Sequence, residues 1–464
     1  MKLKVAEIIE STRGTLIHGN TDDNVSGICT DTRDLVPGSL FVALEGENFD
    51  GHNFIVDAVK KGAKAIVGNK EKVLKHAGSV SAILIGVDDS IFALGEIAHH
   101  WRVKHNVRVI ALTGSNGKTS TKEMIARLLG KKYRVLKNVM NLNNLIGVPL
   151  TLFNLTDEHE IAVIEMGMNR PGEIRRLAEI AEPDCGLITN IQPAHLEGLG
   201  SIEGIQNAKG ELFDGVKESG ILFVNLDDPR VTELAKKFNR RKVTFGRSPE
   251  AEVRLIEILT QSIEGTLFRV RFGTRDFDLF LPVLGKHQVA NALAAATVAW
   301  ELGVPVEDIK EVLSSHRPVR QRMEVRKIKG EVFLLNDSYN ANPASVVAAL
   351  ETVAEIEKYG RCFAALGAML ELGPESAKYH RQVGSKVAEL GYQGLLSLGD
   401  LGKEIIEGAR GAGMPEEYLF LGKDHAEVAG KLSRWLQPGD WVLVKGSRGS
   451  RMELVIENLV ENER

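Results

Sequence analysis

Residues 108–129, RVIALTGSNGKTSTKEMIARLL, constrain the fold of this chain more than any other stretch. The apolar run 109–112 is typical of a buried parallel strand, and residues 114–117 form a glycine-rich turn. From Lys118 onward, apolar residues recur at the spacing of a helix. The stretch therefore predicts a strand, a tight loop and a helix in succession, which is a unit of α/β proteins with parallel sheets.

A loop in this setting is suited to binding phosphate, because free backbone N–H groups and the helix dipole both attract an anion. Lys118 would reach the outer phosphates of a nucleotide, and the Thr119 hydroxyl would bind Mg²⁺. The usual pattern has a further glycine five residues before Gly117, where this sequence has Leu112. A purely structural glycine turn is the alternative, but the strand–loop–helix context favours nucleotide binding.

Length and composition indicate an ordinary globular protein with several cores. The 464 residues suggest roughly two to four domains. The net charge of 58 − 62 = −4 argues against a general nucleic-acid or membrane-surface binder. The three cysteines are far apart, and the N-terminal MKLKVAEIIE carries charges within its apolar pattern, unlike a signal peptide or a membrane span. We therefore expect a reduced, cytoplasmic setting.

Changes in pattern divide the chain into three α/β units. Residues 1–88 form a small unit, residues 89–316 contain the glycine-rich loop, and residues 317–464 alternate strands with helices. The alternation in the last unit predicts a parallel, Rossmann-like sheet. Because no Gly-x-Gly-x-x-Gly follows its first strand, we assign this unit no dinucleotide.

Polar strings interrupt the first two units at predicted loops. Asp31-Thr32-Arg33 and Asp50-Gly51-His52 lie beside predicted strands, and on their own they are best explained as turn formers. The asparagine-rich segment 138–149 suits a polar substrate such as a peptide or a sugar, because amides both donate and accept. A plain asparagine-rich loop explains that segment equally well.

Candidate metal ligands follow two predicted strands of the central unit. Glu165 and His195 end these strands, at the edge where such sheets bind ligands, so both could approach the phosphates and hold Mg²⁺. Histidine suits this ion less well, which leaves His195 as either a ligand or a water-orienting residue. Taken alone, Lys209 is best explained as a solvated helix residue. Gln288 and Asn291 could read an adenine edge, but capping of their helix is the simpler explanation.

Short motifs run in a distinctive order along the chain: DTR, PGSLFVALEG, DGH, TGSNGKT, NLNNLIGVP, EMG, AHLEG, AKGEL, GKHQVANALAA, RME, DSYNANP and KGSR. Together they resemble the Mur ligases of peptidoglycan synthesis, and the resemblance covers essentially the whole chain. It is strongest to the members that add D-alanyl-D-alanine. The DNPR string of the members that add the third peptide residue is absent from the sequence.

The resemblance implies a UDP-sugar domain, a central ATPase and a C-terminal Rossmann-like domain, with the limits given above. It implies ATP-driven amide formation through an acyl phosphate, which joins UDP-N-acetylmuramoyl-tripeptide to D-alanyl-D-alanine. The third residue of the tripeptide would be lysine or diaminopimelate. ATP and two Mg²⁺ ions are the implied cofactors. The implied partners are these small molecules, without nucleic acid or a membrane span, and we expect a monomer.

The resemblance also assigns roles to residues of this sequence. It changes the expectation for Lys209, because the matching lysine in the family is typically carbamylated and becomes an anionic metal ligand. The implied catalytic residues are Lys118, Glu165, His195 and Lys209, and the implied metal ligands are Thr119, Glu165, His195 and carbamylated Lys209. The implied ATP contacts are Gly114, Ser115, Asn116, Gly117, Lys118, Thr119, Ser120, Asn291, Arg322 and Asp337.

The implied substrate contacts fall into three sets. The UDP-sugar side is matched by Asp31, Thr32, Arg33, Asp50, Gly51 and His52. The muramoyl peptide side is matched by Asn143 and Asn144. The incoming dipeptide is expected to face Asn340, Asn342, Lys445, Ser447 and Arg448.

One position departs from the family pattern. The family usually has aspartate in LGDMxELG, and this sequence has Ala368 there, with Glu371 and His380 as nearby polar candidates. Two other interpretations remain open. The first is another ligase of the superfamily, such as one that adds the third peptide residue or a folylpolyglutamate synthase. A nucleotide-binding protein without ligase activity is the second.

Overall fold

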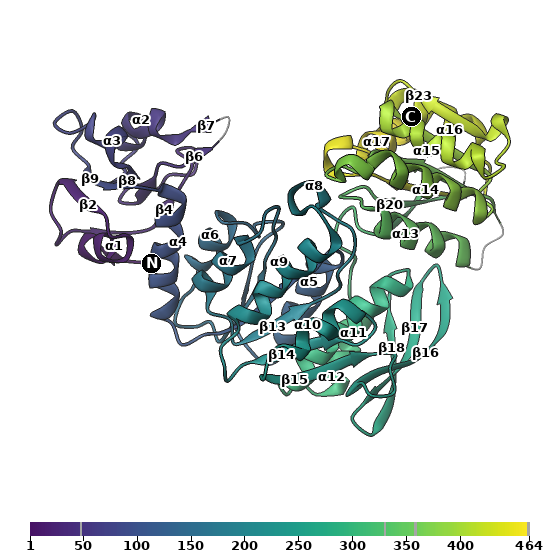
Figure 1. Ribbon diagram of the computed structural model, residues 1–464, viewed down its shortest axis with the longest axis horizontal. Coiled ribbons are helices and arrows are strands. Elements are labelled where there is room, and N and C mark those ends of the chain that lie inside the picture. The colour runs from purple at the N-terminus through teal and green to yellow at the C-terminus, as the bar shows by residue number, and fades with distance from the viewer. Residues whose placement is uncertain (47–48, 329–330, 357–359, 462–464) are drawn as a thin grey trace.

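Each of three α/β units is built on one large β-sheet, and two further two-stranded sheets lie in the N-terminal unit. The structure is a computed structural model and describes residues 1–46, 49–328, 331–356 and 360–461. The N-terminal unit (purple) and the C-terminal unit (green to yellow) lie at opposite ends of the central, mostly teal unit (Figure 1). The predicted fold class, three α/β units with mostly parallel sheets, is confirmed.

The N-terminal unit contains a five-stranded sheet with the order β2-β9-β8-β5-β4, in which β2 alone runs antiparallel to its neighbour. Its inner strands are short apolar runs buried on both faces, as parallel strands usually are. The elements are β1 (Leu3–Lys4), α1 (Val5–Thr12), β2 (Thr15–His18), β3 (Asn24–Val25), β4 (Ile28–Cys29), β5 (Leu40–Val42), β6 (Glu45–Gly46), β7 (Phe49–Asp50), α2 (Ile55–Lys60), β8 (Ala65–Asn69), α3 (Lys70–Leu74) and β9 (Ile83–Val87).

The long helix α4 (Ser90–Val103) joins this unit to the next. It packs against α1 on one side and against α6 and α7 of the central unit on the other, as Figure 1 shows. Asp89 begins the helix by accepting hydrogen bonds from the backbone N–H groups of Ile91 and Phe92. The predicted limit between residues 88 and 89 falls just before this helix, and we keep it as a proposed domain limit.

The central unit contains a nine-stranded sheet with the order β11-β12-β10-β13-β14-β15-β16-β17-β18. The strands are parallel as far as β16, and β16, β17 and β18 form an antiparallel extension. The elements are β10 (Arg108–Thr113), α5 (Lys118–Leu129), β11 (Val135–Lys137), α6 (Gly147–Leu152), β12 (Ile161–Glu165), α7 (Glu173–Ala181), β13 (Cys185–Ile188), α8 (Leu196–Leu199), α9 (Ile202–Gly215), β14 (Ile221–Asn225), α10 (Pro229–Lys236), β15 (Arg241–Gly246), β16 (Val253–Ser262), β17 (Gly265–Phe272), β18 (Arg275–Leu281), α11 (Lys286–Glu301) and α12 (Val306–Ser314).

The C-terminal unit contains a six-stranded sheet with the order β19-β20-β24-β21-β22-β23, parallel except for β19. The elements are β19 (Glu324–Ile328), β20 (Val332–Asp337), α13 (Pro343–Glu355), β21 (Cys362–Leu366), α14 (Ser376–Glu389), β22 (Gly394–Leu398), α15 (Gly399–Gly411), β23 (Leu419–Gly422), α16 (His425–Trp435), β24 (Trp441–Lys445) and α17 (Glu453–Glu461). The proposed limit at residue 316 falls between α12 and β19.

Two further findings bear on the predictions. The asparagine-rich segment ends in a helix rather than in a loop, because α6 begins at Gly147 and takes Pro149 into its first turn, where proline is tolerated. No helix of the described residues is long and apolar enough to cross a membrane.

Candidate active site

The glycine-rich loop connects β10 to α5, as the sequence predicts. Gly114 and Gly117 both have positive φ, at 154° and 81°. A Cβ on Gly114 would lie 1.8 Å from Oγ1 of Thr189, and one on Gly117 would lie 2.1 Å from Oδ1 of Asn291. Only glycine fits this close approach of backbone to neighbouring side chains. Lys118 Nζ donates to the Gly114 carbonyl at 2.7 Å, so the ammonium folds back over the loop.

A cleft of about 730 Å³ opens between this loop and the C-terminal unit. It gathers predicted residues from both units along one surface. The predicted residues that line it are Ser115, Asn116, Gly117, Lys118, Thr119, Ser120, Asn143, Glu165, His195, Lys209, Asn291, Arg322, Asp337, Asn340, Asn342, Lys445, Ser447 and Arg448. The cleft is therefore the candidate active site, and it depends on both units.

Glu165 ends β12 with its side chain held in a buried pocket beside the loop. Its Oε1 accepts hydrogen bonds from Thr119 Oγ1 at 3.3 Å and from Asn143 Nδ2 at 2.8 Å. Its Oε2 is buried and has no hydrogen-bond donor among the described residues. The Thr119 hydroxyl and the Glu165 carboxylate, which keeps one oxygen without a donor, are the kind of oxygen ligands that suit Mg²⁺. These two residues therefore fit the ion that the sequence predicts.

Lys122 is a residue of the cleft wall's buried network that no sequence motif indicated. It lies one turn after Lys118 on α5 with no exposed side-chain area, and its Nζ donates to the carbonyls of Asn138 at 2.8 Å and Met140 at 3.1 Å. The Asn138 carboxamide in turn bonds both the backbone N–H and the backbone carbonyl of Glu165. The helix, the asparagine-rich segment and the carboxylate are thus joined by one buried polar network. The one sign of this role in the sequence is the presence of a lysine on a helix that is otherwise rich in buried residues.

Lys209 lies on α9 and is only 1% exposed, so its interpretation as a solvated helix residue was wrong. The ammonium forms no hydrogen bond or ion pair with any residue that the structure describes. Burial, and then the charge of Lys118, lower the pKa of Lys209 well below its ordinary value. Burial also lowers the pKa of Lys118, although Glu165 opposes this effect. A lowered pKa favours the neutral, nucleophilic form of a lysine amine.

The adenosine and phosphate contacts predicted from the sequence lie on two units. Arg322 Nη2 donates to Thr119 Oγ1 at 3.3 Å, and its guanidinium lies 4.3 Å from the ring centroid of Tyr339. Asp337 accepts from the Met323 N–H at 3.1 Å and pairs with Lys445.

The interpretation of Gln288 and Asn291 as helix caps was wrong. Helix α11 begins after Gly285 without a side-chain cap, and Asn291 Nδ2 instead donates to Gln288 Oε1 at 3.2 Å. Both side chains line the cleft. The adjacent His287 is held neutral, because burial lowers its pKa to about 4.

The C-terminal loops reach the cleft through two asparagine-containing contacts. Asn342 Nδ2 donates to Asn116 Oδ1 at 2.7 Å, which ties the C-terminal unit to the glycine-rich loop. Asn340 offers its carbonyl to Lys445 Nζ at 2.9 Å. Ser447 Oγ donates to the Ala341 carbonyl at 3.1 Å, and Arg448 pairs with Glu453 at 3.0 Å.

A second contact between the units involves His195. Its Nδ1 lies 2.5 Å from Oε2 of Glu371, and this hydrogen bond lowers the pKa of the Glu371 carboxyl group. Helix α8, which begins after His195, lies against the C-terminal unit in Figure 1.

Several predicted residues lie elsewhere. Asn144 accepts hydrogen bonds from Ile146 and Gly147 and so caps α6, while its neighbour Asn143 faces the cleft. Asp31 and Arg33 pair with each other in the N-terminal unit, which holds the pKa of Asp31 near 2. Thr32 lies buried between them and offers its carbonyl to Lys61.

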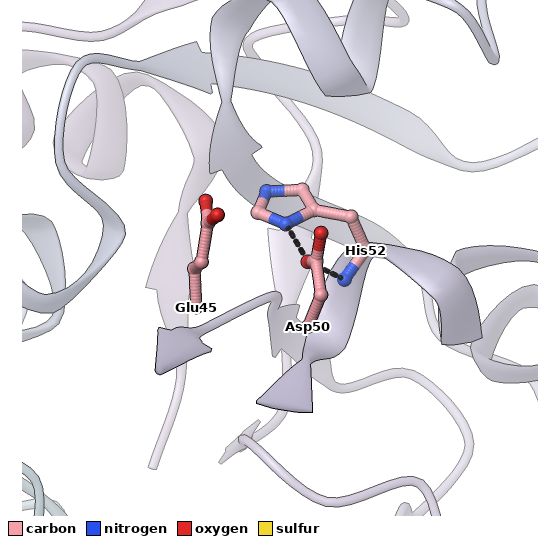
Figure 2. A group of neighbouring side chains, drawn as sticks. All are labelled: Glu45, Asp50 and His52. Atoms are coloured by element: carbon pink, nitrogen blue, oxygen red, sulfur yellow. Dashed lines mark hydrogen bonds and ion pairs between the residues drawn. The ribbon is translucent and has the colours of Figure 1, made fainter. Parts of the chain in front are cut away.

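Of the remaining predicted residues, Asp50 ends β7 in the N-terminal unit, and Gly51 and His52 begin the short 3-10 helix that Asp50 caps. Figure 2 shows Asp50 accepting from both the ring and the backbone N–H of His52, with Glu45 nearby. His52 Nε2 accepts from the Asn69 N–H at 2.8 Å, so both ring nitrogens are occupied. The carboxylates of Glu45 and Asp50 and the imidazole of His52 are close enough together to hold a metal ion. The ammonium of Lys72 already pairs with both carboxylates, however, so the cluster is explained as an ion-pair network.

The glycine-rich loop, the buried carboxylate beside it and the cleft shared by two α/β units define a P-loop nucleotide-dependent enzyme. Family models match three segments: "Mur ligase family, catalytic domain" over residues 24–102, "Mur ligase middle domain" over 112–299 and "Mur ligase, glutamate ligase domain" over 321–448. The chain belongs to the Mur ligase family.

Full-length relatives support the same assignment. The UDP-N-acetylmuramoyl-tripeptide–D-alanyl-D-alanine ligase of Bacillus subtilis (strain 168) is 36% identical and covers 100% of this chain and 99% of its own. The enzyme of the same name from Escherichia coli (strain K12) is 38% identical, covering 95% of each chain. A crystal structure of MurF from Acinetobacter baumannii superposes with a TM-score of 0.90 at 30% identity and 99% coverage of both chains.

Proposed function

We propose that this chain is an ATP-dependent, ADP-forming ligase that joins D-alanyl-D-alanine to UDP-N-acetylmuramoyl-tripeptide in peptidoglycan precursor synthesis. Relatives that carry this name match the chain along its full length. A similar structure, MurF of Thermotoga maritima, was solved in complex with ADP, with a TM-score of 0.84 and 29% identity. The observation that carries the proposal is the buried, unpaired Lys209 beside Lys118, because a protein that only binds a nucleotide has no need of it.

The chemistry follows from the weakness of a carboxylate as an acyl donor. The terminal carboxylate of the tripeptide attacks the γ-phosphorus of ATP, which breaks the bond to the β-phosphate bridging oxygen and releases ADP. The amine of D-alanyl-D-alanine then attacks the acyl phosphate, phosphate departs with the bonding electron pair, and the ammonium loses a proton. The protein contributes chiefly by positioning these groups and neutralising the charge on the phosphoryl oxygens.

The roles of the cleft residues are part of the proposal. Residues 114–120 bind the triphosphate through backbone N–H groups, and Lys118 neutralises the transferring phosphoryl group. Asn291, Arg322 and Asp337 contact the adenosine and the phosphates. Thr119 and Glu165 would hold one Mg²⁺, and His195 with carbamylated Lys209 would hold a second. Ions held there would neutralise charge on the phosphate oxygens.

Carbamylation requires a neutral amine that attacks CO₂, and the buried Lys209 is suited to this step. Burial and the charge of Lys118 lower its pKa, which favours the unprotonated amine. The product is an anion, which removes the repulsion with Lys118 and replaces it with attraction. The buried position of Lys209 therefore supports a carbamate as the state that completes the site.

The two outer units would bind the two substrates. The loops of Asp31 to Arg33 and of Asp50 to His52 would face the UDP-sugar, with Asn143 and Asn144 on the muramoyl peptide side. The Ser447 loop, with Asn340, Asn342, Lys445 and Arg448, would face the dipeptide. We further propose that the protein acts as a monomer in the cytoplasm.

The test of this proposal is ADP release by the purified full chain with ATP, Mg²⁺ and UDP-N-acetylmuramoyl-tripeptide. We expect sustained ADP release only when D-alanyl-D-alanine is also present. Single D-alanine serves as the matched control acceptor and should support little release. Release that is absent, or equally fast without the dipeptide, would contradict the proposal.

A further inference from the structure

Glu371 reaches across the boundary between the C-terminal and central units to His195. The carboxylate Oε2 lies 2.5 Å from the ring Nδ1, and the backbone carbonyl of Glu371 accepts from the N–H of Glu197 at 3.2 Å. Side chain and backbone of one residue thus hold the segment that begins α8. His195 and Glu371 both line the cleft that also contains Lys209.

The contact contributes little to folding, which indicates that it serves the site. The side chains are 24% and 52% exposed, and ion pairs this accessible to solvent stabilise a protein only weakly. His195 and Glu371 both adopt left-handed backbone conformations, with φ of 56° and 63°. Such conformations are unfavourable for residues other than glycine and are concentrated at functional sites.

The hydrogen bond determines which ring nitrogen is available to the cleft. With Nδ1–H donating to the carboxylate, the lone pair of the neutral ring lies on Nε2. Nε2 makes no hydrogen bond with the residues that the structure describes. A carboxylate that holds one ring nitrogen fixes both the tautomer and the orientation of a histidine that binds a metal ion with the other.

The Glu371 segment is also tied to the loop proposed to face the dipeptide. Ser447 Oγ accepts from the Leu370 N–H at 2.9 Å, and the Ser447 N–H donates to the Ala368 carbonyl at 2.9 Å. Glu371 is therefore held to the dipeptide side of the cleft, while His195 belongs to the nucleotide side.

We propose that Glu371 is a positioning residue that orients His195 across the domain boundary. The metal site beside Lys209 is then complete only when the C-terminal unit is docked as it is here. Phosphoryl transfer would thus wait until the dipeptide side is in place, which protects the acyl phosphate from water. This inference rests on the proposed function, and it assigns Glu371 a role that is exerted through His195.

The test compares Glu371→Ala, His195→Asn and the double variant with the natural chain. Glu375→Ala is the matched control, because Glu375 is a nearby carboxylate that pairs on the surface with Lys378. The direct readout is Mn²⁺ affinity, measured by electron paramagnetic resonance with saturating ADP, and turnover is measured in parallel. We expect Glu371→Ala to weaken binding of the more weakly held Mn²⁺ by about 10-fold, with a similar loss of turnover.

Two outcomes decide the inference. If Glu371 acts through His195, the double variant binds Mn²⁺ no more weakly than His195→Asn alone, and Glu375→Ala binds it like the natural chain. Unchanged Mn²⁺ affinity in Glu371→Ala, or losses that multiply in the double variant, would overturn the inference. Failure of the natural chain to form product would contradict the proposed function instead, and the Mn²⁺ comparison would still test the role of Glu371.

Discussion

The ammonium of Lys122 lies 3.7 Å from Oε2 of Glu165, and the two side chains are 0% and 2% exposed. A buried ion pair of this kind is a weak source of net stability, but removing one partner leaves an uncompensated charge. Here the anion is the proposed metal ligand, and the cation stands on the helix that follows the phosphate-binding loop. The pair therefore links the position of the carboxylate to the position of the phosphates.

Lys122→Met should destabilise the protein and impair the site together. We expect a loss of about 3 kcal/mol in the free energy of unfolding, because Glu165 is left buried without its cation. Urea unfolding measures this loss. The double variant Lys122→Met/Glu165→Gln removes the unpaired charge and should recover much of the stability, though no activity. If the loss of unfolding free energy in the double variant equals the sum of the losses in the two single variants, the pairing of these two residues is not the cause of the instability.

Lys118→Ala should abolish ADP formation while leaving the fold intact. The side chain is proposed to neutralise the transferring phosphoryl group, and loss of one such contact typically costs at least about 100-fold in turnover. Steady-state ADP release measures the effect, and circular dichroism checks the fold. Lys104→Ala is a suitable control, since Lys104 pairs with Glu7 and does not line the cleft. Turnover close to that of the natural chain would refute the role of Lys118.

Lys209→Ala should lose activity and regain part of it with added short carboxylic acids. The cavity left by the side chain would admit a small carboxylate in place of the carbamate. Turnover measured across a series of acetate and propionate concentrations tests this, with chloride at equal ionic strength as control. Full activity of the variant without any added acid would exclude an essential carbamate.

Acid should destabilise the protein through His316, which is 6% exposed. Burial and then Arg127 lower the pKa of His316 from 6.5 to about 4. Between these two pH values the unfolded chain binds more protons than the folded one. The contribution of His316 to stability is therefore fully present above pH 6.5 and is lost as the pH falls towards 4. The titration of His316 alone accounts for a loss of up to about 3 kcal/mol in the free energy of unfolding.

The measurement is the free energy of unfolding in urea at several pH values for the natural chain and for His316→Gln. We expect a shallower dependence on pH between 4 and 6.5 in the variant, even if the substitution lowers stability at every pH. Equal dependence in the two proteins would show that His316 does not titrate as described.

The parts of the fold that were predictable are those with a local signal. The alternation of strands and helices in the C-terminal unit was predictable, because β21, β22 and β24 are short apolar runs between turn-forming residues. The loop at Gly114 and Gly117 was predictable for the same reason, since its glycines and the following helix are adjacent in the sequence. The ends of less regular elements, such as α6, were not.

The parts of the site that local patterns do not reveal depend on contacts between distant residues. Lys209 has the local pattern of a surface lysine, and only the packing of α9 against the sheet shows that it is buried. The bond from His195 to Glu371 joins residues 176 positions apart, for which no local spacing is informative. Asn143 and Asn144 are adjacent and chemically identical, yet one faces the cleft and the other caps a helix.

The most direct test of the central claim is the mass of the product. UDP-N-acetylmuramoyl-tripeptide, D-alanyl-D-alanine and ATP would be incubated with the full chain, and the sugar nucleotide would be analysed by mass spectrometry. We predict a product heavier than the tripeptide substrate by one dipeptide less one water, formed in equal amount to ADP and phosphate. ADP formed without this product, or a product carrying any other added unit, would contradict the account.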